Sequence, residues 1–232
     1  MSGGGADAND RLTAQFAFLN EADRLKSVLR ATTLFDGSRR ENSGEHSWHL
    51  ALYAMALADQ AAPEVRINRV IRMLLLHDLV EIDVGDVPIH SANGQAHGST
   101  ATHDAEAKAA ARIFGLLPPD QSAAFLALWQ EFEAAKTPDA IFAKALDRVQ
   151  PVMANLMSGG GTWVEYKVTS DQLDDRVGTK IARGAPRLWA WVRAKTRAYA
   201  YLTTAPNRLL TDTAEKRLKV LSDLDSLGAG FQ

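Results

Sequence analysis

The sequence predicts an all-α protein, a bundle of about seven to ten helices. Apolar residues recur at helical spacing, as at Leu12, Phe16 and Leu19. Stretches rich in alanine and leucine run without glycine or proline, and no stretch has the alternation typical of a strand. Because no linker divides the helices, we expect one domain over residues 10–226, with flexible tails at 1–9 and 227–232.

Glycine and proline divide the first half of the chain into helices. Apolar positions with lysine and arginine between them predict a helix over residues 10–30. Residues 31–44 are polar with two glycines and predict a loop. Residues 45–60 suit a buried helix, and Pro63 should open the next helix, which runs to Ile82 and stops before a glycine. The loop that follows, 86–100, contains two glycines and a proline and could form a lid.

Capping signals mark helices in the second half. Gly115 closes an alanine-rich helix over 101–114. Thr137 before a proline predicts the start of a helix that reaches Met157, where three glycines end it. Thr169 and the glutamine three residues later form a capping box for a short helix. Further helices are expected over 118–135, 185–203 and 206–224.

The composition limits the partners of the chain. Its 232 residues are 46% hydrophobic and 23% charged, with a net charge of −2 and a pI near 6.3. This balance gives no basic field for nucleic acid or an anionic membrane. The absence of cysteine excludes disulfides, thiolate zinc sites and a cysteine nucleophile. Without a signal peptide or the ~18–20 apolar residues that span a bilayer, we expect a cytoplasmic protein that binds neither nucleic acid nor membrane.

One stretch combines an apolar run with charged residues. Residues 73–86 begin with Met-Leu-Leu-Leu and then carry ionisable side chains at five of ten positions: His77, Asp78, Glu81, Asp83 and Asp86. Buried charges without partners cost several kcal/mol each. A metal ion is the natural compensation.

Four residues could supply the ligands of such an ion. His77 and Asp78 are adjacent on one predicted helix, His46 lies near the start of another, and Asp147 lies in a third. Two imidazoles and two carboxylates suit one divalent transition metal ion (Mn²⁺, Co²⁺, Fe²⁺, Ni²⁺ or Zn²⁺) better than Ca²⁺. Such an ion acidifies water and neutralises charge on phosphoryl oxygens.

These ligands lie among five short motifs: Leu25-Lys26-x-Val28-x-Arg30, Glu45-His46-Ser47, His77-Asp78-x-x-Glu81-x-x-x-Gly85-Asp86, Leu128-Trp129-x-Glu131-Phe132-Glu133 and Phe142-x-Lys144-x-Leu146-Asp147. The ordered set resembles the HD-domain metal-dependent phosphohydrolases, and the surrounding residues resemble the branch that contains the 5′-deoxynucleotidases. The resemblance covers residues 10–157 and leaves the helices over 158–226 without an assigned role.

The resemblance implies an HD-type helical fold and a metal held by His46, His77, Asp78 and Asp147. It also implies a homodimer that removes the 5′-phosphate from deoxynucleoside monophosphates. Three further residues match functional positions of the family. Glu81 matches an acidic residue near the attacking water, Asp86 one near the sugar and leaving oxygen, and Arg30 a phosphate-binding arginine.

The chain departs from its relatives at Thr33, where the family often has a tryptophan that packs on the sugar. The resemblance therefore does not extend to the sugar contact. Two other functions stay open: a nucleotide tri- or pyrophosphohydrolase, which needs more basic side chains than Arg30 alone, and a non-catalytic metal-stabilised nucleotide-binding protein. Intact Glu81 and Asp86 argue against the latter, because a structural site needs neither.

Several polar residues near the motifs have two possible roles. His49 and Glu106 could support the site or simply pack, and His103 with Asp104 repeats the His-Asp pair in polar surroundings. A second metal would need extra histidines before Asp147, for which His90, His97 and His103 are available. We expect a single metal, because two of these histidines fall in the predicted 86–100 loop.

Overall fold

The computed structural model describes residues 4–91 and 99–202. Its centre is α7 (Pro138–Met157), which is buried on nearly all sides. Ala143, Leu146 and Val149 are fully buried in this helix, as expected for a helix enclosed by others. Packed against it are α2 (Ser43–Ala56), α3 (Ile67–Leu76) and α10 (Thr179–Gly184).

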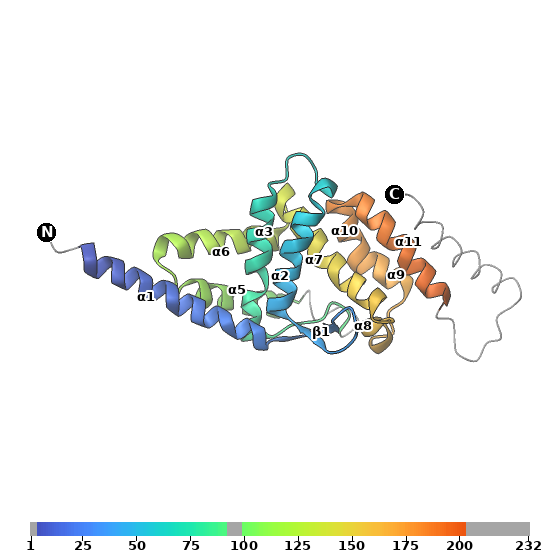
Figure 1. Cartoon of the computed structure of the whole chain (residues 1–232), viewed down its shortest axis with the longest axis horizontal. Helices are drawn as coiled ribbons and strands as arrows, with labels where there is room; N and C mark the ends of the chain where they lie inside the picture. The colour runs from blue at the N-terminus through green and yellow to red at the C-terminus, as the bar shows by residue number, and fades with distance from the viewer. Residues whose placement is uncertain (1–3, 92–98, 203–232) are drawn as a thin grey trace, which may run out of the picture.

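The remaining helices extend the molecule in two directions (Figure 1). On one side α1 (Gly4–Asp23) lies near α5 (Thr100–Phe114) and α6 (Pro119–Ala134). On the other side, the C-terminal part of the described chain packs against α7. It consists of α8 (Gly161–Glu165), α9 (Ser170–Leu173), a π-turn over Asp174–Gly178, α10 and α11 (Pro186–Leu202).

The all-α prediction is confirmed, with one correction: a small antiparallel sheet replaces the end of the first predicted helix and the predicted 31–44 loop. Strand β1 (Leu29–Thr33) pairs with β2 (Arg40–Asn42), with Leu29 opposite Asn42. The turn between them uses Gly37 at φ 70°. Three consecutive β1 residues from Arg30 are buried, so the strand lacks the alternation by which a half-buried strand is recognised.

The first helix also differs in its bounds. It begins at Gly4 rather than residue 10, so most of the predicted tail is helical, and it ends at Asp23 before a 3₁₀ turn over Arg24–Ser27. The helix predicted over 206–224 lies outside the described residues, as does the 92–98 part of the predicted 86–100 loop.

The helix predicted from Pro63 to Ile82 is divided in the structure. It begins at Ile67, where the Asp139 carboxylate on α7 accepts hydrogen bonds from the Arg66 backbone N–H at 2.7 Å and from its guanidinium at 2.7 and 2.9 Å. It ends at Leu76 and continues as a 3₁₀ turn, η3 (His77–Val80), and a short helix, α4 (Glu81–Val84). A tightened turn inside a helix often marks a functional position. Here it carries the His-Asp pair.

Candidate metal centre and its pocket

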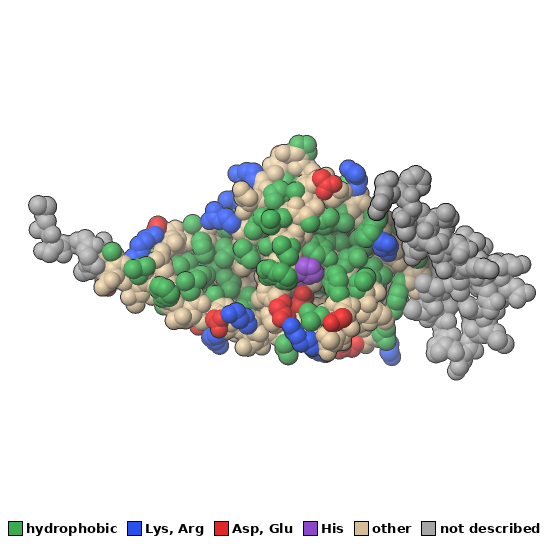
Figure 2. Space-filling model, viewed as in Figure 1, with side chains coloured by type: hydrophobic (Ala, Val, Ile, Leu, Met, Phe, Trp, Pro, Cys, Tyr) green, Lys and Arg blue, Asp and Glu red, His purple; other side chains and the backbone are tan. Residues whose placement is uncertain are grey.

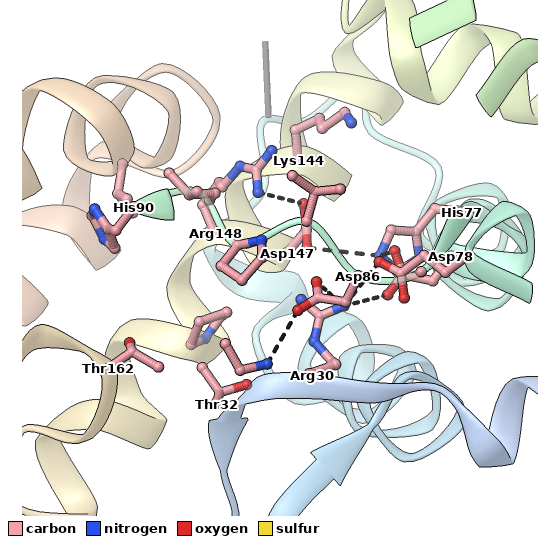
Figure 3. A pocket seen from close by; sticks show the side chains of 18 of the residues that line it. Arg30, Thr32, His77, Asp78, Asp86, His90, Lys144, Asp147, Arg148 and Thr162 are labelled. Atoms are coloured by element: carbon pink, nitrogen blue, oxygen red, sulfur yellow. Dashed lines mark hydrogen bonds and ion pairs between the residues drawn. The ribbon is translucent and has the colours of Figure 1, made fainter. Parts of the chain in front are cut away.

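The four predicted metal ligands meet in the interior of the protein. His46 on α2 places its Nε2 3.3 Å from Asp147 Oδ1 on α7 and 4.0 Å from Asp78 Oδ2 on η3. His77 Nε2 lies 3.0 Å from Asp78 Oδ1 and 3.7 Å from Asp147 Oδ1. All four side chains are buried. Figure 3 shows His77, Asp78 and Asp147 on one side of the pocket.

The orientation of His77 fits a metal ligand. Its Nδ1 lies 2.8 Å from the Leu74 carbonyl oxygen, to which a protonated Nδ1 donates, so that Nε2 keeps its lone pair. Nε2 is buried and makes no hydrogen bond to any described residue, although two carboxylates face it. A divalent cation would satisfy this nitrogen and both carboxylates together.

Charges within the cluster shift its pKa values. Burial alone would lower the pKa of His77, but the charges of Asp78 and Asp147 raise it to about 10. Despite burial, the His77 and Arg30 charges hold the pKa of Asp78 well below its usual range. The pKa of Asp147 is also held well below its usual range despite burial, by the Arg148 charge and by the contacts with His46 and His77. In the metal-free protein a proton on His77 therefore replaces part of the cation's charge.

This proton predicts how metal binding depends on pH. The raised pKa of His77 means that, between pH 6.5 and about 10, the folded metal-free protein binds more protons than the unfolded chain. Its stability should therefore fall as pH rises through this window, while metal affinity rises because the ion competes with fewer protons. Urea midpoints of the chelated protein and chelator competition across the window measure both trends. A metal affinity independent of pH would contradict the prediction.

Two residues that the sequence did not single out support His46. Its Nδ1 lies 3.1 Å from Gln150 Oε1 on α7 and 3.4 Å from Glu41 Oε2 on β2. Gln150 Nε2 in turn donates to Glu41 Oε1 at 2.9 Å. These contacts orient the ring so that Nε2 faces the cluster. His49 does not join the cluster: its ring packs edge-on against Tyr53 and its Nδ1 lies 3.4 Å from Gln150.

We expect Glu41→Gln to weaken metal binding roughly ten- to hundredfold, because partners that orient a ligating histidine contribute about this much. Chelator competition measures the change. Glu64→Gln makes the same chemical change at an exposed position and should leave the affinity unaltered. Equal affinities of the two variants would show that Glu41 does not position His46.

Arg30 and the two predicted catalytic carboxylates lie beside the cluster. Arg30 Nη1 donates to Asp78 Oδ2 at 2.7 Å and lies 3.5 Å from Glu81 Oε1 and 3.8 Å from Asp86 Oδ1. Asp86 Oδ2 accepts from the Ala31 backbone N–H at 3.1 Å (Figure 3). Burial and the Asp78 charge raise the pKa of Glu81 to about 8. The structure thus brings all seven predicted site residues together.

The side chain of Asp83 points away from this group. It accepts two hydrogen bonds from Arg112 on α5, both at 2.6 Å, and does not line the pocket. The placement agrees with the sequence, which gave Asp83 no role at the site.

A pocket opens from the cluster and is walled by distant parts of the chain. Lys144 and Arg148, one turn apart on α7, line it, as does His90 after α4 (Figure 3). Arg176 lies 3.4 Å from His90 Nδ1, and burial together with the Arg176 and Arg148 charges lowers the pKa of His90 to about 4. The sequence did not single out Lys144 or Arg148 as site residues, because only the fold brings these positions of α7 to the pocket.

A second group of potential ligands lies on the pocket wall. His103, Glu106 and Glu133 bring ligand atoms within 4.8 Å of one another. Lys144 donates to Glu133 at 2.9 Å, so an ammonium already balances this group, and His103 is 57% exposed. Of the other histidines weighed for a second metal, His90 contacts Arg176, and His97 lies outside the described residues.

Comparison with known proteins identifies the family. The HD domain family model matches residues 22–189. The chain belongs to the HD-domain family. The match reaches past residue 157 and includes α8, α9 and α10, which the motifs had left unassigned.

Two curated relatives and one solved structure resemble the chain further. It is 29% identical over 137 residues to 5′-deoxynucleotidase HDDC2 of Homo sapiens, a match that covers 59% of this chain and 64% of the relative. It is 25% identical to 5′-deoxynucleotidase hdd1 of Schizosaccharomyces pombe over 58% of this chain and 67% of the relative. A predicted metal-dependent phosphohydrolase from Magnetospirillum magnetotacticum MS-1 superposes with a TM-score of 0.76 at 50% identity and covers 82% of this chain and 96% of that one.

No helix in the described part of the chain combines the length and apolar character needed to cross a bilayer.

Proposed function

We propose that the protein is a metal-dependent phosphomonoesterase that releases phosphate from nucleoside 5′-monophosphates, with deoxynucleotides preferred. The observation that carries the proposal is the buried cluster of two histidines and two aspartates, His46, His77, Asp78 and Asp147, which opens on a pocket beside Arg30. The likeness to two proteins named 5′-deoxynucleotidases and to a protein named a metal-dependent phosphohydrolase supports the same chemistry.

Each side chain near the cluster has a chemical role in this reaction. A bound divalent cation lowers the pKa of water and neutralises charge on phosphoryl oxygens. Arg30 presents a planar donor fork to two phosphate oxygens. The pKa of Glu81 is raised even though the nearby Arg30 charge lowers it. Glu81 can therefore exchange a proton near neutral pH. Asp86, fixed by the Ala31 N–H, lies where it can orient the leaving group.

Phosphate release from a panel of nucleoside 5′-monophosphates tests the proposal with Co²⁺- or Mn²⁺-loaded protein. We expect orthophosphate and nucleoside as products from at least one substrate. Glu81→Gln should lower kcat at least tenfold, since positioned acid–base groups contribute about 10²–10⁴-fold. The control Asp83→Asn alters a carboxylate two residues away that is paired with Arg112. No release across the panel from protein with bound metal would refute the proposal.

A tri- or pyrophosphohydrolase is the second candidate, and the cations that line the pocket favour it. Lys144 and Arg148 line the pocket as Arg30 does and, although Glu133 and Asp147 pair with them, they offer further donors to a longer phosphate chain. Product analysis separates the candidates, because this activity would yield pyrophosphate or triphosphate in place of orthophosphate. Metal and nucleotide binding without any product would instead indicate the non-catalytic alternative.

A homodimer is our proposal for the assembly, and two exposed apolar stripes support it. Leu12, Phe16 and Leu19 follow one side of α1, each more than half exposed. Trp48, Leu52 and Met55 repeat the spacing on α2, and Figure 2 shows hydrophobic side chains gathered over the middle of one face. We also propose a cytoplasmic location, which cell fractionation would test.

We expect the double variant Phe16→Glu, Met55→Glu to be a monomer by light scattering under conditions in which the unaltered protein is a dimer. Two carboxylates placed in an apolar interface cannot be buried without partners. Trp191→Glu is the control, because Trp191 is 53% exposed on α11, at the other end of the molecule. An unchanged mass of the double variant would exclude these stripes from the interface.

A further inference from the structure

The side of the pocket that faces the metal cluster from across the cavity belongs to the C-terminal part of the described chain. Figure 3 places Thr162 opposite His77 and Asp78. Thr162, Trp163 and Tyr166, on and directly after α8, line the pocket together with Val152 of α7 and Val177 of the π-turn. This wall is apolar and aromatic, whereas the metal side is charged.

Hydrogen bonds hold α8 in a fixed place on α7. Asn155, itself only 3% exposed, accepts from the Thr162 backbone N–H at 2.8 Å and from the Thr162 hydroxyl at 3.0 Å. Its own carbonyl accepts from the Gly160 N–H at 2.7 Å. Gly161 has a φ of 39°, and a Cβ at this position would collide with the Asn155 side chain. The tight turn therefore needs glycine, and it fixes the residues that follow.

The two aromatic residues of the wall are held in different ways. Trp163 is 9% exposed and packs edge-on against Tyr199 of α11, with ring centroids 6.1 Å apart. Tyr166 is partly exposed. It lines the same pocket as Asp86, and burial together with the Glu165 charge raises the pKa of its phenol. Together they give the pocket an aromatic surface.

A phosphate ester bound at Arg30 with its organic part on the side away from His77 and Asp78 would lie along this wall, since Thr162 faces these residues across the pocket. We propose that Trp163 and Tyr166 form the face that binds the planar base of a nucleotide substrate. The proposal rests on the proposed function and deepens it. It assigns selection of a nucleoside with a planar base to the C-terminal helices, whereas the phosphate chemistry belongs to the residues before Arg148.

Two phosphate esters that differ only in the base test the inference. They are 2′-deoxyadenosine 5′-monophosphate and 2-deoxyribose 5-phosphate, assayed with the metal-loaded protein. Loss of one aromatic contact with a base weakens binding roughly ten- to hundredfold. We therefore expect Trp163→Leu and Tyr166→Leu to raise the KM of the nucleotide by this factor and to leave the KM of the sugar phosphate nearly unchanged. An equal rise for both esters, or none for the nucleotide, would overturn the inference.

A binding measurement separates this inference from the proposed function. The probe is a non-hydrolysable 5′-phosphonate analogue of the same nucleotide, titrated by calorimetry into the metal-loaded protein. If the two variants bind the analogue more weakly than the unaltered protein, the aromatic wall is supported even when no ester is hydrolysed. In that case only the proposed function fails. Failure of the unaltered protein to bind the analogue, or equal binding by the variants, would overturn the inference whatever the activity.

Conservative and remote substitutions control for folding. Trp163→Phe keeps an aromatic ring and should recover most of the affinity lost in Trp163→Leu, an outcome that a purely structural defect would not produce. Trp191→Leu removes an exposed indole on α11 outside the pocket and should bind the analogue like the unaltered protein. Because Tyr166 is only partly buried, Tyr166→Leu tests the wall even if Trp163→Leu does not fold.

Discussion

Asp147→Asn should abolish metal retention and lower the rate of phosphate release by about a thousandfold or more, because a catalytic cation lowers the activation free energy by several kcal/mol. The substitution keeps the volume of the side chain but removes a carboxylate whose Oδ1 faces both imidazoles, at 3.3 and 3.7 Å. An amide binds a divalent cation more weakly, and its NH₂ group cannot accept in place of the lost oxygen. Of the four ligands, Asp147 is the one that α7 supplies.

Metal content after dialysis, measured by mass spectrometry, and phosphate release are the two readouts for Asp147→Asn. Asp83→Asn is the matched control, because it makes the same change in a carboxylate paired with Arg112 outside the pocket. A variant that keeps both one metal per chain and its turnover would remove Asp147 from the ligand set. Retained metal with lost turnover would instead give Asp147 a role in catalysis only.

Arg30→Met should destabilise the metal-free protein by about 3–5 kcal/mol, the usual cost of leaving a buried charge without its partner. Arg30 is 9% exposed and approaches Asp78, Glu81 and Asp86 within 3.8 Å. Despite its burial, these charges raise the pKa of Arg30, so the residue stays cationic. Without it, Asp78 would keep its contact to His77, whereas Glu81 and Asp86 would lose the guanidinium that faces them.

Urea unfolding of the chelated protein measures this loss, and metal addition should reverse part of it because the ion supplies positive charge to the same carboxylates. The control is Arg112→Met. Arg112 also joins two carboxylates, Asp83 and Glu21, but it is 44% exposed and should contribute no more than about 1 kcal/mol. Equal losses in the two arginine variants would contradict the buried network.

The parts of the fold that local signals determine were predictable from sequence. The bounds of α7 were predicted correctly because Thr137 accepts from the Ala140 N–H at 3.3 Å and a proline occupies the first turn. The capping box at Thr169 was likewise correct. The four proposed ligands could be named because their order along the chain resembles that of a known family.

What the sequence did not reveal depends on contacts between residues far apart in the chain. The start of α3 was placed too early because Asp139, 73 residues beyond Arg66, caps it. Glu41 and Gln150 support His46 from β2 and α7, and neither stands at a recognisable spacing from it. The position of Trp163 at the pocket could not be predicted from the sequence, because only the fold brings α8 to the side opposite the metal cluster.

The link between Arg66 and Asp139 has a consequence for how the ion is acquired. It joins the first turns of α3 and α7, the helices that lead to His77 and to Asp147. These hydrogen bonds fix the two helices, and with them His77 and Asp147, relative to each other without a metal. We therefore expect metal binding to require little ordering of the chain around the proposed ligands. We expect the chelated protein to stay folded and to bind metal again. Selectivity among cations would then depend on their preferred coordination geometry and not on their ability to fold the protein.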